Sequence, residues 1–367
     1  MYSKLTIQNF RCFKKLEVEG LKRINLVTGI NDVGKTSFLE ALFLLVGGFN
    51  PAVPLRLNAL RGLEGVIPNS QEQWGWLFYN HDTNQAIEIF GRLGGDGEDL
   101  LRVHLGTPKE FEQLSKGQQE LRVSASDTQG GLRVGAGFPS TSTAVDLTDL
   151  ILEFSPHKGR SLVSRISVGA DGTVTMEQPK QNAFRPGAFL SARARAAAED
   201  ASRLSELKVS KRDKQVVEAL KAIEPNIRDL TILVSGGPII HADMAGIGLV
   251  PMPLLGDGVG RLLSLTLAIL TTPGGTLLVD EIENGVHHSA LLKVWKGLAS
   301  AAAQAQTQLV ATTHSGECLT AAHQAFSEDP EYDLSVIQLF RLPDGIQGRV
   351  LDRKHIEAAI AGQIDLR

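Results

Sequence analysis

The chain has 367 residues, of which 43% are hydrophobic and 21% charged, and its 37 basic and 41 acidic residues give a formal net charge of -4. This composition excludes fibrous and disordered classes and predicts a globular protein with two domains, or with one large core and an inserted lobe. The near-neutral charge excludes nucleic-acid binding through the field of the whole protein, so such binding would need a local basic patch.

The first predicted element is a β-hairpin. Leu5 and Ile7, and then Leu16 and Val18, alternate with polar residues on either side of a turn at 9–13. A short apolar run at 24–28 follows, and it suits a buried central strand.

Residues 29–36 read Gly-Ile-Asn-Asp-Val-Gly-Lys-Thr and fit the spacing G-x-x-x-x-G-K-T of a phosphate-binding loop. The glycines allow successive N–H groups to point inward at the start of a helix, where the helix dipole also favours an anion. The strand at 24–28 and an apolar helical pattern at 36–46 supply the context that such a loop requires. The plainer alternative is a glycine turn that binds no ligand.

The loop spacing assigns roles to individual residues. We expect Lys35 to reach the β and γ phosphates of a nucleoside triphosphate. We expect the hydroxyl of Thr36 to bind the accompanying Mg²⁺, because this ion prefers oxygen ligands. The candidate nucleotide-binding residues of the loop are Gly29, Asn31, Asp32, Val33, Gly34, Lys35, Thr36 and Ser37.

A β-rich lobe is predicted after the loop helix. An irregular stretch with Pro51, Pro54 and Pro68 comes first. Short strand-like runs then alternate with glycine, aspartate and serine, a pattern typical of an antiparallel sheet. These runs lie at 87–93, 100–105, 121–126, 132–136, 151–154 and 162–168.

Helical patterns follow the β-rich lobe. Residues 194–207 are rich in alanine and predict a helix, and Ser210 with Asp213 resembles a capping box that begins a second helix. A strand-like run at 230–234 and a loop come next.

The glycine cluster Gly256-Asp257-Gly258 opens a nearly all-apolar helix within residues 253–270. Its bare N-terminus suits a phosphate, yet one chain rarely needs two such cradles for one nucleotide. We therefore expect this helix to meet the γ phosphate bound by a second copy, in a head-to-tail dimer. A glycine turn before a core helix is the alternative.

Residues 275–280 form an apolar run that ends in Asp280 and is followed by Glu281. This pattern predicts a buried parallel strand whose carboxyl end delivers acids to a ligand crevice. We expect Asp280 to hold Mg²⁺ through its water shell and Glu281 to polarise the attacking water. A solvated acidic turn is the alternative.

A further strand is predicted at 308–312, and His314 follows it. His314 is a candidate to bind the γ phosphate and sense its loss, against the alternative of a surface histidine in a turn. His287 and His288 have no further cysteine or histidine at zinc spacing, so we expect them not to bind metal. After His314 the sequence predicts a hairpin at Asp344-Gly345 and a short final helix.

Cysteine content and hydropathy indicate the setting. Cys12 and Cys318 form neither a metal-binding spacing nor a disulfide framework, which predicts reduced core residues. No apolar run approaches the roughly 20 residues of a membrane span, and the start of the chain reads as a strand rather than a signal peptide. We therefore expect a cytoplasmic location and no membrane partner.

Five segments carry a family resemblance. They are Asn9-Phe10-Arg11, the loop with Asn31, Gly256-Asp257-Gly258, Asp280-Glu281-Ile282-Glu283-Asn284-Gly285 and Thr312-Thr313-His314-Ser315. In this order they resemble an ABC-type ATPase head of the RecF, SMC and OLD kind, and most closely a stand-alone AAA-family ATPase related to OLD proteins. The likeness covers roughly residues 1–50 and 236–320.

The resemblance implies a P-loop NTPase fold of the α/β class. It implies a two-lobed head with a mixed or parallel core sheet flanked by helices, an antiparallel β lobe and a short helical insertion. The expected segments are an N-terminal half of the head (1–95), the β-rich lobe (96–190), the helical insertion (191–235) and a C-terminal half (236–367).

The resemblance also implies ATP and Mg²⁺ as ligands and an ATP-dependent homodimer. Carried over by motif, Lys35 and Thr36 bind phosphate and magnesium, Asp257 and Gly258 act in trans, Glu281 is the catalytic carboxylate and His314 is the switch histidine. Arg11 is a candidate nucleotide contact.

Several features depart from the family pattern. Gly256-Asp257-Gly258 replaces the Leu-Ser-Gly-Gly signature of transporters and SMC heads, and no long coiled coil is present. Gln71 and Gln73 are available for a glutamine loop, which the sequence does not place. The segment after His314 is too short for the Toprim nuclease of OLD proteins, so if DNA is cut, we expect a partner to cut it.

Three functions remain open at this point. The first is a Mg-dependent ATPase that drives dimerisation and serves DNA repair or defence against phage through an effector or nuclease partner. The second is a nucleotide-gated scaffold with little turnover. The third is an ATP-controlled DNA clamp, which would use the basic run Arg193, Arg195, Lys208, Lys211, Arg212 and Lys214, although a solvated helix face explains that run more simply.

Overall fold

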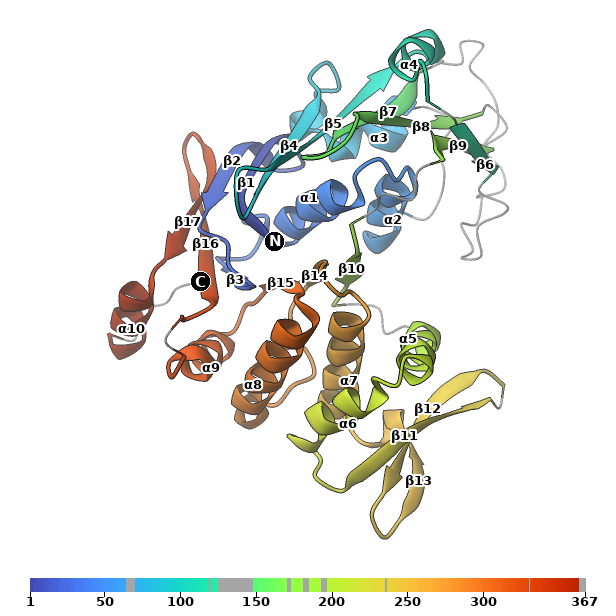
Figure 1. Ribbon diagram of the computed structural model, residues 1–367. Helices are drawn as coiled ribbons and strands as arrows, with labels where there is room; N and C mark the ends of the chain where they lie inside the picture. Colours follow the sequence, from blue (N-terminus) through green and yellow to red (C-terminus); the bar gives the residue numbers. More distant parts are fainter. Residues whose placement is uncertain are drawn as a thin grey trace.

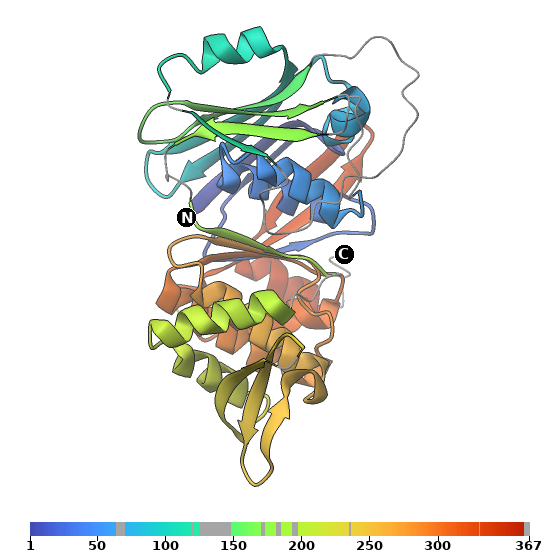
Figure 2. The same cartoon turned by 90° about the vertical axis from the view of Figure 1, so that its right-hand side faces the viewer.

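The computed structural model describes residues 1–63, 70–118, 120–124, 148–169, 173–180, 185–192, 197–234, 236–329 and 331–362. In these residues an antiparallel sheet forms one lobe, and a mostly parallel sheet with helices below it forms the other (Figure 1). Helix α1 (Lys35–Gly47) lies between the two sheets and contacts strands of both (Figure 2). The predicted α/β fold with two lobes is confirmed.

Within the described residues, the antiparallel sheet has eight strands in the order β2-β1-β4-β5-β7-β8-β9-β6. The predicted hairpin at its edge is confirmed, with Phe10 opposite Phe13, so that Arg11 and Cys12 form the turn. The strands are β1 (Tyr2–Phe10), β2 (Phe13–Glu19), β4 (Ile87–Leu93), β5 (Glu98–Gly106), β6 (Glu120–Ser124), β7 (Asp149–Ser155), β8 (Leu162–Val168) and β9 (Val174–Pro179).

The second sheet, in the part of the chain that the structure describes, has six strands in the order β10-β14-β15-β3-β16-β17. All pairs are parallel except the β16–β17 hairpin, which the Asp344-Gly345 signal predicted. The central strands β3, β14 and β15 are buried throughout, as expected for a sheet covered on both faces. The strands are β3 (Ile24–Thr28), β10 (Gly187–Leu190), β14 (Thr276–Val279), β15 (Gln308–Thr312), β16 (Leu334–Leu342) and β17 (Gly345–Leu351).

Helices and a small third sheet cover the side of the six-stranded sheet opposite α1 (Figures 1 and 2). Helices α5 and α6 pack on α7 and on the three-stranded sheet β11-β12-β13. The elements of this layer are α5 (Ala197–Val209), α6 (Asp213–Lys221), β11 (Ile227–Val234), β12 (Pro238–Met244), β13 (Gly248–Pro251), α7 (Asp257–Leu270), α8 (His288–Ala305) and α9 (Gly316–Phe326). The chain also forms α2 (Ala52–Leu60), α3 (Ser70–Trp74), α4 (Pro108–Leu114) and α10 (Arg353–Ala361), which is the predicted final helix.

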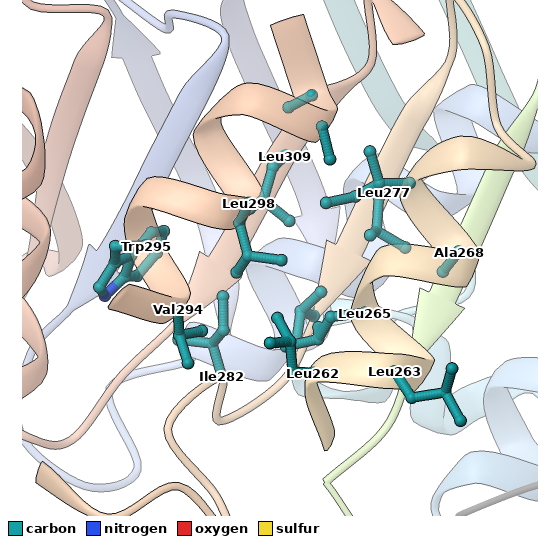
Figure 3. Close-up of a cluster of buried hydrophobic side chains, with 14 of the residues drawn as sticks. Leu262, Leu263, Leu265, Ala268, Leu277, Ile282, Val294, Trp295, Leu298 and Leu309 are labelled. Atoms are coloured by element: carbon teal, nitrogen blue, oxygen red, sulfur yellow. The ribbon is translucent and has the colours of Figure 1, made fainter. Parts of the chain in front are cut away.

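The hydrophobic core beneath the six-stranded sheet joins α7 and α8 to β14 and β15 (Figure 3). Leu265, Leu277, Leu298 and Leu309 are completely buried there. Each such side chain contributes about 1.5–3 kcal/mol relative to an exposed one. This packing holds the carboxyl ends of β14 and β15, where the candidate acids and His314 follow, in a fixed relation.

Two local predictions about the helices were wrong. The proline-rich stretch after α1 was expected to be irregular but contains α2, since Pro51 is its N-cap and Pro54 lies in the first turn, where a missing N–H costs no helical hydrogen bond. The expected capping box is absent. Arg212 is the N-cap of α6, and the Ser210 hydroxyl instead donates to the carbonyls of Glu206 and Leu207 at the end of α5.

One further prediction, the loop after residue 234, was wrong, and two others concern residues outside the described ranges. Two strands of the small sheet, β12 and β13, occupy the region expected to be a loop. The predicted strand at 132–136 and residues 194–196 of the predicted helix lie outside the described residues. Strand β10 falls within 96–190 but belongs to the six-stranded sheet, while β1, β2 and β4 join the antiparallel lobe. The division into four segments stays a prediction.

Candidate functional site

The loop between β3 and α1 curls around the side chain of Lys35. Its Nζ donates to the carbonyls of Gly29 at 2.6 Å and Ile30 at 3.0 Å. Gly34 is the N-cap of α1 at φ 96°, and no side chain caps the helix. A Cβ at Gly34 would lie 2.6 Å from Cys12 Sγ, so this left-handed position requires glycine for space as well as for conformation. The loop therefore presents backbone N–H groups and one ammonium at a helix start, which suits an anion.

Burial and charge act on Lys35 in opposite directions. Burial lowers the pKa of the Lys35 ammonium, and the nearby carboxylates of Asp280, Glu283, Glu281 and Asp32 partly oppose that shift. Desolvation of this kind strengthens the attraction of the ammonium for a phosphate.

Asp280 follows the end of β14 directly and faces the loop across the site. Thr36 Oγ1 donates to the carboxylate, at 3.2 Å from Oδ1 and 3.1 Å from Oδ2. Thr312 Oγ1, at the end of the neighbouring strand β15, donates to Asp280 Oδ1 at 2.6 Å. Three segments far apart in sequence therefore meet at one carboxylate.

Glu281 has a left-handed backbone, with φ at 49°. This conformation is unusual for a residue with a side chain and persists only where its surroundings fix it. The Glu281 N–H donates to Thr312 Oγ1 at 2.8 Å, and Arg261 of α7 donates to the carbonyls of Asp280 and Glu281 at 3.0 and 3.2 Å. These bonds turn the chain sharply at the strand end.

His314 lies beside Glu281. Its Nε2 is 3.5 Å from Glu281 Oε1, and the side chains are 40% and 41% exposed respectively, so both reach solvent in the site. The His314 N–H donates to Glu283 Oε1 at 2.7 Å. The histidine and the two acids thus lie at neighbouring strand ends, as the sequence predicted for the carboxyl edge of a parallel sheet.

The phosphate loop, Asp280, Glu281 and His314 line a cavity of about 1200 Å³. Most of the predicted site residues border it, namely Gly29, Asn31, Asp32, Gly34, Lys35, Thr36, Ser37, Asp280, Glu281 and His314. Five predicted residues are not among its lining: Val33, Arg11, Gly256, Asp257 and Gly258. The Val33 side chain is 1% exposed and packs in the core.

Arg11 belongs to a charged cluster in the cavity wall that the sequence did not predict. Glu40 of α1 is 1% exposed and accepts from Arg61 Nε at 2.7 Å and Nη2 at 3.1 Å, while Arg11 Nε lies 3.3 Å from its Oε2. Burial lowers the pKa of the Arg11 guanidinium, which the Glu40 charge partly opposes. Both Glu40 and Arg61 border the cavity. No sequence spacing signals this cluster, because its members come from a hairpin turn, α1 and the end of α2.

We expect the substitution Glu40→Gln to destabilise the fold by about 2 kcal/mol, because it leaves Arg11 without its counter-charge in a buried place. Arg61 is 40% exposed, so water offsets part of its loss. Urea unfolding of the variant should show a lower midpoint at unchanged slope. Glu218→Gln, which alters a carboxylate that is 70% exposed, is the matched control. Equal midpoints for both variants would contradict the proposed contribution of the cluster to the free energy of unfolding.

The start of α7 lies beside the turn at Gly285, and its residues Gly256, Asp257 and Gly258 are not among those that line the cavity. Gly256, its N-cap, has φ 92°, and a Cβ at Gly258 would lie 3.5 Å from the carbonyl oxygen of Gly285. Leu254, just before this helix, is 74% exposed. Gly256 and Asp257 at the helix start are likewise exposed.

The other candidate residues fall as follows. Gln73 is buried and does not border the cavity, and the side chain of Gln71 lies outside the described part. The rings of His287 and His288 are tilted by 38° with centroids 4.1 Å apart, and His287 Nδ1 accepts from the Ser289 N–H as the cap of α8. Cys12 and Cys318 are both free thiols, as expected.

The donor set at the acidic strand end fits Mg²⁺. Thr36 and Asp280 offer only oxygen atoms, the ligands this ion prefers, and leave positions for water and phosphate oxygens. Within the described residues, no group of three or more His, Cys, Asp or Glu side chains is placed to hold a metal ion. This observation is consistent with a magnesium site in which Thr36 and Asp280 supply two ligands and the nucleotide and water supply the others. No helix in the described ranges has the length and apolar content needed to cross a bilayer.

Two domain families match the chain. Residues 4–136 match a family described as "AAA domain", and residues 139–318 match one described as "AAA domain, putative AbiEii toxin, Type IV TA system". Together the matches include the phosphate loop, the acidic strand end and His314.

Related proteins and solved structures agree with these matches. An ATP/GTP phosphatase of Helicobacter pylori is 23% identical over 348 residues, which is 89% of each chain. The DNA replication and repair protein RecF of Histophilus somni is 32% identical over 131 residues, 33% of this chain and 37% of RecF. The crystal structure of an SMC head bound to the C-terminal winged-helix domain of ScpA has a TM-score of 0.50 at 11% identity, covering 96% of this chain and 98% of that one, so the fold is that of an SMC head.

Proposed function

We propose that this chain, which resembles ABC-type ATPase heads of the RecF, SMC and OLD kind, binds Mg·ATP in the cavity beside Lys35 and hydrolyses the γ phosphate there. One observation carries the proposal: Thr36 Oγ1 lies 3.1 Å from Asp280 Oδ2, which joins the phosphate loop to the acidic strand end across one cavity. Phosphoryl transfer depends mainly on positioning and on charge stabilisation, and this junction provides both.

Each residue has a defined task in this proposal. The loop N–H groups and Lys35 bind the phosphates, and Thr36 with Asp280 would hold Mg²⁺, which neutralises charge on the phosphate oxygens when bound. Glu281 orients the attacking water and accepts its proton. His314, 3.5 Å from Glu281, donates a hydrogen bond towards the γ phosphate and registers its departure.

Removal of divalent cations should abolish turnover. We expect phosphate release by the purified chain to fall at least about 100-fold in EDTA, because a metal supplies several kcal/mol of charge stabilisation. Restoring Mg²⁺ should restore the rate. Phosphate release in steady state, with and without EDTA, is the measurement, and metal-independent turnover would contradict the proposed roles of Thr36 and Asp280.

The same assay distinguishes an ATPase with repeated turnover from a nucleotide-gated scaffold. A scaffold would bind one ATP per chain and release no more than one phosphate per chain even with Mg²⁺ in excess. Repeated turnover supports the enzyme. We favour the enzyme because Glu281 and His314 both reach the cavity, whereas ATP binding alone needs neither.

We also propose a head-to-tail homodimer in which Gly256, Asp257 and Gly258 of one copy contact the nucleotide of the other. Two features support it: Gly256 and Asp257 at the start of α7 are exposed, and neither they nor Gly258 line the cavity of their own chain. ATP binding would then close the dimer and hydrolysis would reopen it. Light scattering of the chain with and without ATP tests this step directly.

We propose a cytoplasmic role in DNA repair or in defence against phage, exerted through a separate effector or nuclease. The similarity to a RecF protein supports repair, and the match to a family named for an AbiEii toxin supports defence. An ATP-controlled DNA clamp has less support. Lys208 pairs with Asp213 and Arg212 donates to the carbonyl of Leu270, so two cations of the basic run serve the fold, and Arg193 and Arg195 lie outside the described residues.

A further inference from the structure

Glu283 is an acid to which the proposed function assigns no task. It follows Glu281 by two residues, and its Oε1 accepts the His314 N–H at 2.7 Å. Its Oε2 is buried and accepts no hydrogen bond within the described part of the chain. A buried carboxylate oxygen without a donor costs free energy, and such an atom calls for a physical explanation.

The carboxylate lies among groups of the site. The pKa of the Cys318 thiol is raised to about 12, first by burial and then by the Glu283 charge. The same charge acts on Lys35 and raises its pKa against the effect of burial. Glu283 is itself partly buried, with Oε1 on the His314 N–H and Oε2 shielded from solvent.

The segment that carries His314 is short and depends on such a contact. Strand β15 ends at Thr312 and α9 begins at Gly316, with Ser315 as its N-cap. The Thr313 N–H donates to the carbonyl of Val27 at 3.0 Å, and the next N–H, that of His314, donates to Glu283. The His314 side chain is 40% exposed, and this backbone sets the direction in which its Cα–Cβ bond leaves the chain.

The main chain of Glu283 takes part in a second contact, the hydrogen-bonded turn at 283–286. Its carbonyl accepts the Val286 N–H at 2.9 Å, which closes the turn containing Gly285. Gly285 in turn lies against Gly258 at the start of α7. One residue therefore joins the segment of the switch histidine to the turn beside the proposed dimer contact.

From these contacts we propose that Glu283 is a positioning residue, whose carboxylate fixes the backbone of His314 so that the imidazole faces Glu281 and the γ phosphate. The inference rests on the proposed function and names a further determinant of the same reaction. Glu283 is not among the residues that line the cavity, so in this proposal it has no direct contact with the nucleotide. Its effect reaches the reaction only through His314.

The first test compares three substitutions of Glu283. Glu283→Ala removes the acceptor, and we expect kcat to fall about 10-fold with an unchanged KM for ATP, as for the loss of a residue that orients a reacting group. Glu283→Gln keeps an acceptor oxygen at the same reach and should retain most of the rate. Glu283→Asp keeps the charge but is one methylene shorter, so it should resemble the alanine variant. The matched control Glu218→Ala removes an exposed carboxylate of α6 and should leave kcat unchanged.

The second test is a double-mutant cycle with His314→Ala. If Glu283 acts through the imidazole, Glu283→Ala should cause no further loss of kcat in the His314→Ala background. Independent losses that multiply would overturn the proposal. So would a raised KM at constant kcat, or an aspartate variant as active as the wild type. Should the alanine variant fail to fold, the cycle with Glu283→Asp gives the same decision.

Failure of this inference can be told apart from failure of the proposed function. If Lys35→Ala and Glu281→Gln leave ATP turnover intact, the proposed function is wrong. If those two variants lose activity while all Glu283 variants match the wild type, only the role of Glu283 is wrong.

Discussion

Replacing Glu281 with glutamine is expected to lower kcat for ATP hydrolysis by about 100- to 10,000-fold, the usual contribution of a general base. The amide keeps the size of the side chain but cannot accept the proton of the attacking water. Nucleotide binding should persist, because the phosphate loop and Asp280 are unchanged. Steady-state phosphate release and equilibrium binding of ATP are the two measurements.

The same variant should accumulate a closed dimer in ATP, because hydrolysis no longer reopens it. Light scattering in ATP should show a larger dimer fraction than for the wild type. Glu218→Gln is the matched control, since its carboxylate is exposed on α6 and pairs with Lys221. Normal turnover by the Glu281 variant would end the proposed mechanism. Purification of this variant in ATP is also the most direct way to capture an effector.

Replacing Lys35 with alanine is expected to weaken ATP binding by about 100-fold or more. Charge-assisted hydrogen bonds contribute about 1.5–3 kcal/mol each, and every 1.4 kcal/mol changes an affinity tenfold. Lys35 is also 5% exposed, so its charge acts with little screening by water. Calorimetric titration with ATP measures the loss directly.

Lys221→Ala is the control for this prediction, because it removes a lysine from the surface pair with Glu218. The fold should survive in both variants, and their unfolding midpoints without nucleotide should lie close together. An affinity of Lys35→Ala equal to that of the control would show that the loop does not bind phosphate.

The spacing of short segments was sufficient to predict much of the site. The sequence 29–36 carries its geometry in its glycines, and the structure places Gly29 at φ 144° and Gly34 at φ 96°. The acidic strand end and His314 follow apolar runs of the length of buried strands. Parallel strands end at a common edge of the sheet. The sequence pattern of each strand was therefore enough to infer that Asp280, Glu281 and His314 lie close together.

Other features had no local signal. Helix α2 was missed because prolines usually mark irregular segments, although the first turn of a helix accepts them. Strand β10 is four residues long, and only its pairing with β14 identifies it. The three-stranded sheet was partly missed for the same reason, since a strand is stabilised by partners that the sequence does not show.

The sequence by itself determined the components of the site. They are a phosphate loop, two acids after one strand, a histidine after another strand, and the helix start that we propose contacts the nucleotide of a second copy. Local backbone rules and hydrophobic periodicity determine these features, and both act within a few residues along the chain. Only the tertiary structure decided that Arg11 and Arg61 share Glu40, that Arg261 holds the turn at Glu281, and that Glu283 holds His314. Those contacts depend on how separate elements pack, and hydrogen bonds between distant segments form only where packing brings donor and acceptor within about 3 Å.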